Sequence, residues 1–177
     1  QPQKYSVSFW DTFDTVITLS GYARNQSAFD AVAARAHAEF QRLHAIFDKY
    51  QEHPGVNGLW ALNHAGGEEL RVADELWELI SLCASQYEEL GGRVNIALGG
   101  VLALWSECRE AAALPPQDAL RAAAGHADME GVMLDARNNT VRLADPQTQL
   151  DLGACAKGYA VERVARLIAD EMPSYLI

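Results

Sequence analysis

Cysteine pairs, long apolar runs and an excess of basic residues are all missing from this sequence. The three cysteines, Cys83, Cys108 and Cys155, are widely spaced and form no CxxC pair, which argues against a structural zinc site or a disulfide framework. We expect three buried free thiols, because free cysteine behaves as a small core residue. No apolar run approaches the ~20 residues that a membrane-spanning helix needs. These absences leave a globular protein that is held together by its apolar core.

Basic residues are outnumbered by acidic ones, with 14 Lys and Arg against 24 Asp and Glu and a formal net charge of -10. A nucleic-acid-binding face needs clustered basic residues to displace counterions, so we expect no nucleic acid among the partners. A local basic pocket is still compatible with this balance, and an anionic cofactor is not excluded. With 177 residues, the chain is long enough for one domain with a sizeable core.

Several motifs of nucleotide and hydrolase chemistry are absent as well. The sequence has no Walker A pattern, no GxGxxG and no GxSxG, so it identifies neither a standard phosphate-binding loop nor a nucleophile elbow. Of the five histidines, His37 and His44 are expected on the surface of the first helix. His53, His64 and His126 have no partner carboxylate at metal-ligand spacing along the chain. No catalytic residue is therefore assigned from the sequence.

Hydrophobic periodicity predicts the helices. Apolar residues recur at spacings of three and four over residues 29–50 and again over residues 76–90, which is typical of two amphipathic helices. Either Asn25 or Ser27 is expected to cap the first helix, and Asp74 the second. Further helices are expected over residues 117–124 and 159–168.

β-Branched residues and turn signals predict the strands. Residues 132–135 and 140–143 flank Arg137-Asn138-Asn139, which indicates a hairpin turn because asparagine tolerates a positive φ. Together with the helices, these strands predict a mixed α and β domain. The other expected strands are residues 13–19 (FDTVITL), 150–152 and 174–177 (SYLI).

The stretch DLGACAKGYA, residues 151–160, combines a carboxylate, glycines and a lysine. A helix is expected to begin near Cys155 or Ala156, so backbone N–H groups would attract an anion and Lys157 would add charge at the same place. A turn carbonyl such as that of Ala154 could face a hard cation. An ordinary strand-to-helix turn with a surface lysine explains the same spacing, and the spacing alone favours that simpler interpretation.

Four blocks of the sequence follow one another in an order known from a protein family. They are FDTVITL, FDKY with GLWALN, GGRVNIALGGVLALW and DLGACAKGYAVERV. In this order they resemble the ApbE-like family, the FAD:protein FMN transferases, over about residues 13–177, and the last block is the most specific. The resemblance implies a T-fold-like α+β architecture, in a single domain over residues 1–177, that binds FAD and uses Mg²⁺.

The resemblance also implies an activity. Members of the family cleave the pyrophosphate of FAD, pass FMN to a threonine or serine hydroxyl of an acceptor protein and release AMP. The acceptors are subunits of membrane redox pumps and other exported flavoproteins. Members are commonly exported and often lipid-anchored, so we expect an extracytoplasmic protein with a lipid anchor to the bacterial cell membrane.

Site residues follow from the same resemblance, position by position. Asp151 and Lys157 match residues that touch FAD, and Tyr50 matches a tyrosine beside the flavin or the adenine. Phe13 stands where many members have the methionine of an M-G-T motif, and Ala154 matches a position that joins the Mg²⁺ shell. The other expected cofactor contacts, in the segment that matches G-x-F-D-I, are Arg93, Val94 and Asn95.

The sequence departs from the family pattern at two positions and in length. Asn95 replaces the usual aspartate, so a carboxylate is lost there, and Gly100 replaces a common proline. Family members continue beyond SYLI with acidic Mg²⁺ ligands, so we expect this chain to be the N-terminal portion of the fold. A truncated FAD-binding or flavin-carrier protein without catalysis is therefore an alternative. An acidic interaction module for a basic partner is a third interpretation.

Overall fold

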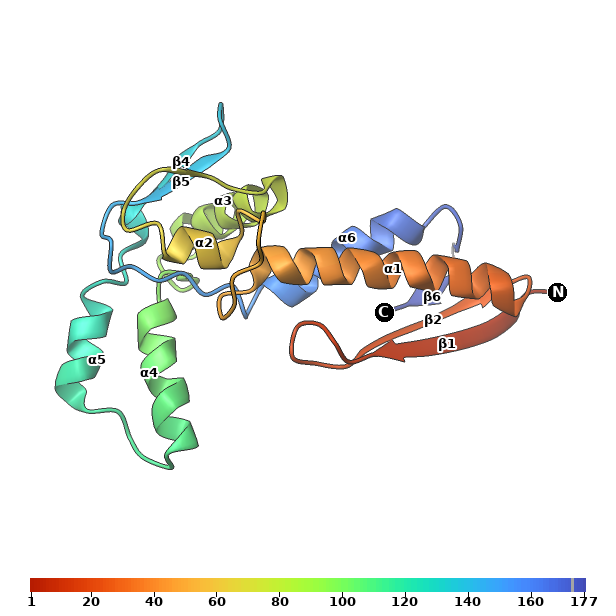
Figure 1. Cartoon of the computed structure of the whole chain (residues 1–177), viewed down its shortest axis with the longest axis horizontal. Helices are drawn as coiled ribbons and strands as arrows, with labels where there is room; N and C mark the ends of the chain where they lie inside the picture. The colour runs from red at the N-terminus through yellow and green to blue at the C-terminus, as the bar shows by residue number, and fades with distance from the viewer. Residues whose placement is uncertain (173) are drawn as a thin grey trace. The chain divides into compact units, whose positions relative to one another are not determined.

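The structure is a computed structural model that describes every residue except 173. It consists of two compact units, which we call the terminal unit (residues 1–45 and 155–177) and the central unit (residues 46–154). Helix α1 (Gln26–Phe47) begins in the first unit and ends in the second (Figure 1). Among the described residues, no helix is both long and apolar enough to span a membrane.

The terminal unit contains a small antiparallel sheet with the strand order β1-β2-β6. β1 (Gln3–Phe9) pairs along its whole length with β2 (Ile17–Ala23), and β6 (Tyr175–Leu176) pairs with the other edge of β2. The strand expected at the closing residues of the chain is thereby confirmed. No strand is predicted from the sequence over the residues of β1. Its residues Tyr5 and Val7 are half-buried and alternate with polar residues, which is the pattern of a half-buried strand.

The strand expected over residues 13–19 begins four residues too early. Phe13 and Asp14 have positive φ angles of 57° and 48°, which belong to a left-handed turn and not to a strand. The N–H of Phe13 donates to Nδ1 of His44 at 3.2 Å, and β2 begins only at Ile17. Because His44 lies 31 residues further along the chain, local β-propensity could not reveal this turn.

Two helices supply most of the apolar core of the terminal unit. α1 is capped by Asn25, whose Oδ1 accepts the N–H of Ala28 at 2.9 Å, so the first of the two expected caps is the right one. α6 (Ala156–Ile168) begins directly after Cys155, where the sequence predicts a helix start. The buried side chains of these two helices include Phe29, Phe40, Leu43, Ala160, Val164 and Ile168.

The central unit contains a second antiparallel sheet, with the strand order β3-β5-β4. β4 (Val132–Asp135) and β5 (Thr140–Leu143) have the bounds expected from the sequence. Asn139 in their turn has a φ of 51°, as the turn signal predicts. The other elements of this unit are α2 (Leu59–Asn63), β3 (Leu70–Arg71), α3 (Asp74–Glu89), α4 (Gly99–Glu110), α5 (Gln117–Ala124) and the 3-10 turn Met129–Gly131.

The second expected amphipathic helix is confirmed as α3, but its cap differs from the prediction. Ala73 is the N-cap residue, and Asp74 is the first residue of the helix, where its negative charge faces the positive end of the helix dipole. Cys83 on this helix is buried as expected. Cys108 and Cys155 are only half-buried, so the prediction of three buried thiols is wrong for these two.

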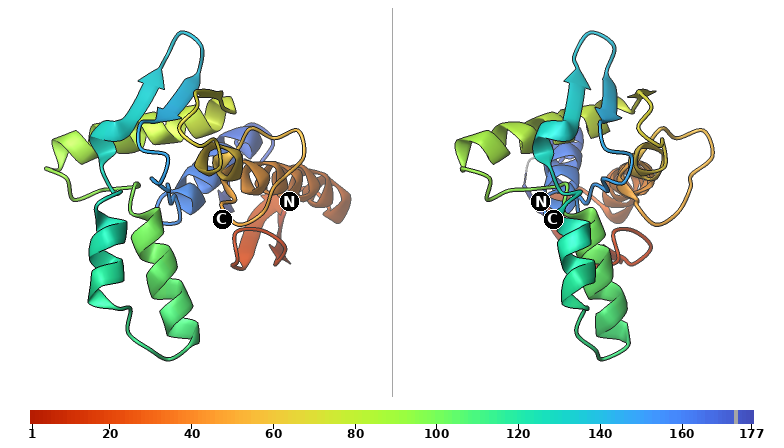
Figure 2. Two further views of the ribbon diagram at one scale, coloured as in Figure 1. Left: turned by 60° about the vertical axis from the view of Figure 1, so that its left-hand side comes forward. Right: turned by 90° about the vertical axis from the view of Figure 1, so that its left-hand side faces the viewer.

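α4 and α5 lie side by side as a helical hairpin (Figures 1 and 2). Both helices are fully described, yet Gly99 is the only buried residue of α4, and α5 has none. Leu102 and Trp105 of α4 are exposed. The hairpin is anchored at its base, where the N–H of Gly99 donates to the carbonyl oxygen of Gln149 at 2.9 Å.

The strand expected over residues 150–152 is wrong. The segment makes a single parallel bridge, between Leu98 and Gln149. Beyond it, the backbone of Leu150 is bonded by a side chain, because Asn63 accepts its N–H at 2.8 Å and donates to its carbonyl oxygen at 3.0 Å. The N–H of Asp151 also donates to the carbonyl oxygen of Ile96 at 2.8 Å, so the segment is held by this backbone bond and by an amide 87 residues away without forming a regular strand.

Candidate functional site

A cavity of about 340 Å³ opens in the central unit. Its walls come from the segment that follows α1, from α4 and from the segment after β5. Small molecules usually bind in concave sites, and the residues that line this one are mostly polar, with Glu107 and Glu110 as well as Lys49 among them. Its lining includes Lys49, Tyr50, Asn63, Ser106, Glu107 and Gln149.

An ion pair that the sequence does not predict joins Lys49 to Asp151. Nζ of Lys49 lies 2.5 Å from Oδ2 of Asp151, and the two side chains are only 20% and 13% exposed. Oδ1 of Asp151 accepts the N–H of Gly153 at 2.7 Å, so both carboxylate oxygens are engaged. Burial opposes the charge of the ammonium, but the hydrogen bond and the charge of Asp151 outweigh it, so the pKa of Lys49 is raised above its ordinary value.

The raised pKa of Lys49 predicts a loss of folding stability at high pH. The pair contributes its full stability below the pKa of an unfolded lysine, near 10.5, and loses it as the pH rises through the higher pKa of the folded protein. We expect the urea midpoint of the wild type to fall toward that of Lys49→Met above that pH. Urea titrations at a series of pH values measure this, and parallel curves for the two proteins would contradict it.

Tyr50 is the expected aromatic residue of the cavity, but it is not part of the buried stripe of α1. The helix ends at Phe47, and Tyr50 is 68% exposed. Nζ of Lys49 lies 4.9 Å from the centroid of its ring. An exposed ring on a cavity wall, with an ammonium beside it, can stack on a planar ligand and attract a phosphate attached to it.

Asn63 also lines the cavity, and its role is not predicted from the sequence. Besides its two side-chain bonds to the backbone of Leu150, its own carbonyl oxygen accepts from Nε2 of Gln149 at 2.9 Å. The side chain is buried, so these bonds are shielded from water. Asn63 therefore holds the segment that leads into Asp151. The available signal is a polar residue that closes the otherwise apolar block GLWALN.

A second cavity, of about 220 Å³, lies in the terminal unit. It brings together Phe13 and Lys157, two residues that the resemblance assigns to the cofactor. Much of the remaining lining is apolar and includes Phe40, Val161 and Ile177. Lys157 lies in the first turn of α6, where backbone N–H groups lack partners within the helix. An apolar wall with a lysine suits a ring system that carries a negative charge.

The other predicted contacts line neither of these two cavities. Arg93 and Ala154 are exposed, and Val94 is half-buried. The amide of Asn95 donates to a backbone carbonyl at 2.9 Å and accepts a backbone N–H at 2.8 Å. An aspartate could not donate the first of these bonds, which gives the departure from the family's aspartate a structural reason.

Carboxylates and imidazoles meet in pairs in this structure. Within the described residues, no group of three or more His, Cys, Asp or Glu side chains could hold a metal ion. Several histidines nevertheless have a carboxylate partner, which their spacing along the chain does not reveal. The pairs are His37–Asp11 at 2.7 Å, His53–Asp48 at 2.9 Å and His126–Asp145 at 2.6 Å.

Comparison with known proteins gives consistent matches. The model of the ApbE family matches residues 13–177. The FAD:protein FMN transferase of Treponema pallidum (strain Nichols) is 33% identical over 146 residues, which are 77% of this chain and 40% of the relative. The protein of the same name from Klebsiella pneumoniae (strain 342) is 28% identical over 136 residues, which are 76% and 42%. The chain thus spans only 40% to 42% of the length of these curated relatives.

Solved structures share the fold. The crystal structure of the ApbE protein from Thermotoga maritima MSB8 has a TM-score of 0.84 at 20% identity, and the match covers 98% of this chain and 55% of that one. The flavin transferase ApbE from Vibrio cholerae has a TM-score of 0.86 at 18% identity and coverages of 99% and 56%. At these identities the likeness concerns the fold, and it confirms the expected α+β ApbE architecture.

Proposed function

Because this chain belongs to the ApbE family, as its four sequence blocks indicate, we propose that it carries a flavin-nucleotide site of an FAD:protein FMN transferase. In that reaction a threonine or serine hydroxyl of an acceptor protein attacks the FMN phosphorus. The pyrophosphate P–O bond breaks, AMP leaves with the bonding electrons, and the hydroxyl proton is released. The observation that carries the proposal is the family match over residues 13–177.

The cavities support this proposal through the groups that line them. Tyr50 offers an aromatic face, and Lys49 beside it offers positive charge for an anionic ligand. Phe13 and Lys157 offer a comparable combination in the cavity of the terminal unit. Asp151 enters the proposal as a cofactor contact that also orients Lys49. The segment Arg93, Val94 and Asn95 stays in the proposal as a further cofactor contact.

Mg²⁺ is part of the proposal, with the carbonyl oxygen of Ala154 as one ligand. The described residues do not by themselves form such a site, because Mg²⁺ prefers several oxygen ligands and no three acidic or imidazole side chains gather. Both oxygens of the nearby carboxylate of Asp151 are already engaged. We therefore derive no chemical step through the metal.

The acceptor and the location are also proposals. By family resemblance, the acceptor is a subunit of a membrane redox pump or another exported flavoprotein. The same resemblance suggests an extracytoplasmic protein with a lipid anchor. The chain itself is strongly acidic, with a net charge of -10, which would favour an acceptor whose docking face is basic.

The proposal is tested by adding FAD, Mg²⁺ and a threonine-containing acceptor peptide to the chain. We expect saturable quenching of flavin fluorescence, because the cavity residues would bind the nucleotide. A gain in peptide mass equal to one FMN less one water would assign the complete reaction to this chain, and a peptide with valine in place of threonine is the control. Binding without transfer would support the alternative of a flavin-binding protein. The absence of saturable binding would contradict the proposal.

A further inference from the structure

Asp48 follows α1 directly and is the only buried carboxylate among the described residues. Its side chain is 5% exposed. Burying a carboxylate is unfavourable unless it is fully hydrogen-bonded, so its partners indicate what it stabilises. Two of these partners, Tyr50 and His53, lie in the loop that contributes Lys49 and Tyr50 to the cavity.

The two carboxylate oxygens of Asp48 bind two different points of this loop. Oδ1 accepts the backbone N–H of Tyr50 at 2.7 Å, and Oδ2 lies 2.9 Å from Nε2 of His53. Because a carboxylate can only accept, Nε2 of His53 carries the hydrogen. The backbone carbonyl of Asp48 also accepts the N–H of Trp60 at 3.0 Å. One residue thus ties the start of the loop to its middle and to the helix that follows it.

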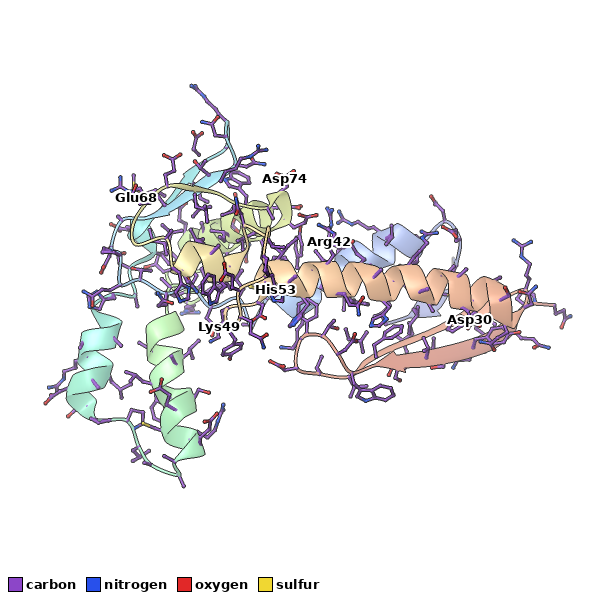
Figure 3. The ribbon with its side chains drawn as sticks, viewed as in Figure 1. Asp30, Arg42, Lys49, His53, Glu68 and Asp74 are labelled. Atoms are coloured by element: carbon purple, nitrogen blue, oxygen red, sulfur yellow. The ribbon has the colours of Figure 1, made fainter. Side chains whose placement is uncertain are left out.

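Little besides the hydrogen bond to Asp48 restrains the position of Tyr50. The residue is 68% exposed, so packing restrains it weakly. Residues 48–58, all of which are described, form no helix or strand. The backbone bond to Asp48 fixes the peptide from which the ring projects. Lys49, which lies between Asp48 and Tyr50 in sequence, is held by its ion pair with Asp151. Lys49 and His53 both lie on this segment after α1 (Figure 3).

We propose that Asp48, braced by His53, is a positioning residue that holds Tyr50 on the cavity wall for a flavin nucleotide. The inference rests on the proposed function of the cavity. Asp48 does not touch the ligand in this arrangement, because its side chain is buried and each of its oxygens binds a residue of the loop. Its effect on affinity should therefore pass through Tyr50.

The test is a double-mutant cycle on FAD binding to the full chain, measured by flavin fluorescence. We expect Asp48→Ala and Tyr50→Ala each to raise the Kd about ten-fold, which is the effect of one lost hydrogen bond or stacking contact. The double variant should bind within about three-fold of Tyr50→Ala, because coupled residues are not additive. A multiplicative loss of about a hundred-fold, or an unchanged Kd for Asp48→Ala, would overturn the inference.

Further variants separate positioning from a general structural role. Asp48→Asn keeps an oxygen that accepts the N–H of Tyr50. His53 can accept from the new amide if its ring proton moves to the other nitrogen. We therefore expect the Kd of this variant for FAD to lie within about two-fold of the wild-type value. If Asp48→Ala does not fold, His53→Ala replaces it in the double-mutant cycle. We expect this variant to raise the Kd for FAD about three-fold, because it removes one of the hydrogen bonds that hold the loop. An unchanged Kd for that variant would equally overturn the inference.

A matched control breaks a histidine–aspartate pair elsewhere in the central unit. Asp145→Ala removes the partner of His126 at 2.6 Å, and neither residue lines the cavity. We expect its Kd for FAD to match that of the wild type, and a ten-fold rise would show that any such break disturbs binding and overturn the inference. A wild-type chain that does not bind FAD would overturn the proposed function itself, which keeps the two failures distinct.

Discussion

Replacement of Gly99 by alanine is expected to destabilise the chain by about 3 kcal/mol, because overpacking and a broken buried hydrogen bond each cost about 1–3 kcal/mol. A Cβ atom at this position would lie 2.4 Å from the carbonyl oxygen of Gln149 and 2.8 Å from its carbonyl carbon. Both are backbone atoms, so no side-chain rotation relieves the clash. The start of α4 has to move away, and the bond from the N–H of Gly99 to this oxygen is lost.

The adjacent Gly100 provides the matched control. A Cβ atom there meets only Ala123, at 4.0 Å, which is an ordinary contact. Gly100→Ala should therefore be neutral or stabilise the helix by up to ~1 kcal/mol. Urea denaturation followed by tryptophan fluorescence measures both variants. Equal stabilities for the two would show that the close approach to Gln149 does not constrain the base of α4.

Asn63→Leu is expected to cost about 4 kcal/mol, because each buried backbone group left without a partner costs about 1–3 kcal/mol. Leucine has a similar size but cannot replace the bonds to the N–H and the carbonyl of Leu150. The segment that leads into Asp151 then loses its support. We therefore expect weaker FAD binding in the same samples, because Asp151, the partner of Lys49, keeps its bond to Ile96 but is preceded by a segment that is held less firmly.

Asn57→Leu is the control for this effect, since it removes the same kind of bond at an exposed site. Nδ2 of Asn57 donates to the carbonyl oxygen of Arg71 at 2.8 Å, but water can replace the amide there. The expected cost is below about 1 kcal/mol. Both variants are compared by urea denaturation. If Asn63→Leu lost no more stability than Asn57→Leu, burial would not be what makes the Asn63 bonds matter.

The elements that the sequence predicts correctly depend on near neighbours. The amphipathic helices follow from apolar spacing, and the β4–β5 hairpin follows from a turn that Asn139 can adopt. The errors arise where a distant side chain decides the backbone. Nδ1 of His44 accepts the N–H of Phe13, so these residues form a turn although their β-propensity predicts a strand. Asn63 bonds Leu150 in the same way.

The candidate site is predictable to the extent that its residues belong to recognisable blocks. Tyr50 and Asp151 follow from FDKY and DLGACAKGYA, and the structure places them on or beside the first cavity. Lys49 is not predicted, because a lone lysine in a loop resembles a surface charge until its partner, 102 residues away, is known. Asp48 is hidden for the same reason, since its burial follows from the folded loop and not from its neighbours in sequence.

Because the α4–α5 hairpin buries so little surface, the walls of the first cavity differ in stiffness. The free energy needed to unfold a segment locally depends on the buried surface and the hydrogen bonds that the segment loses. These two helices, both fully described, bury only Gly99. Ser106 and Glu107 of α4 therefore form a wall that can be displaced while the sheet and α3 remain folded. The wall formed by Lys49 and Asn63 is held by a partly buried ion pair and by buried hydrogen bonds. A ligand larger than the resting volume would meet one compliant side and one rigid side.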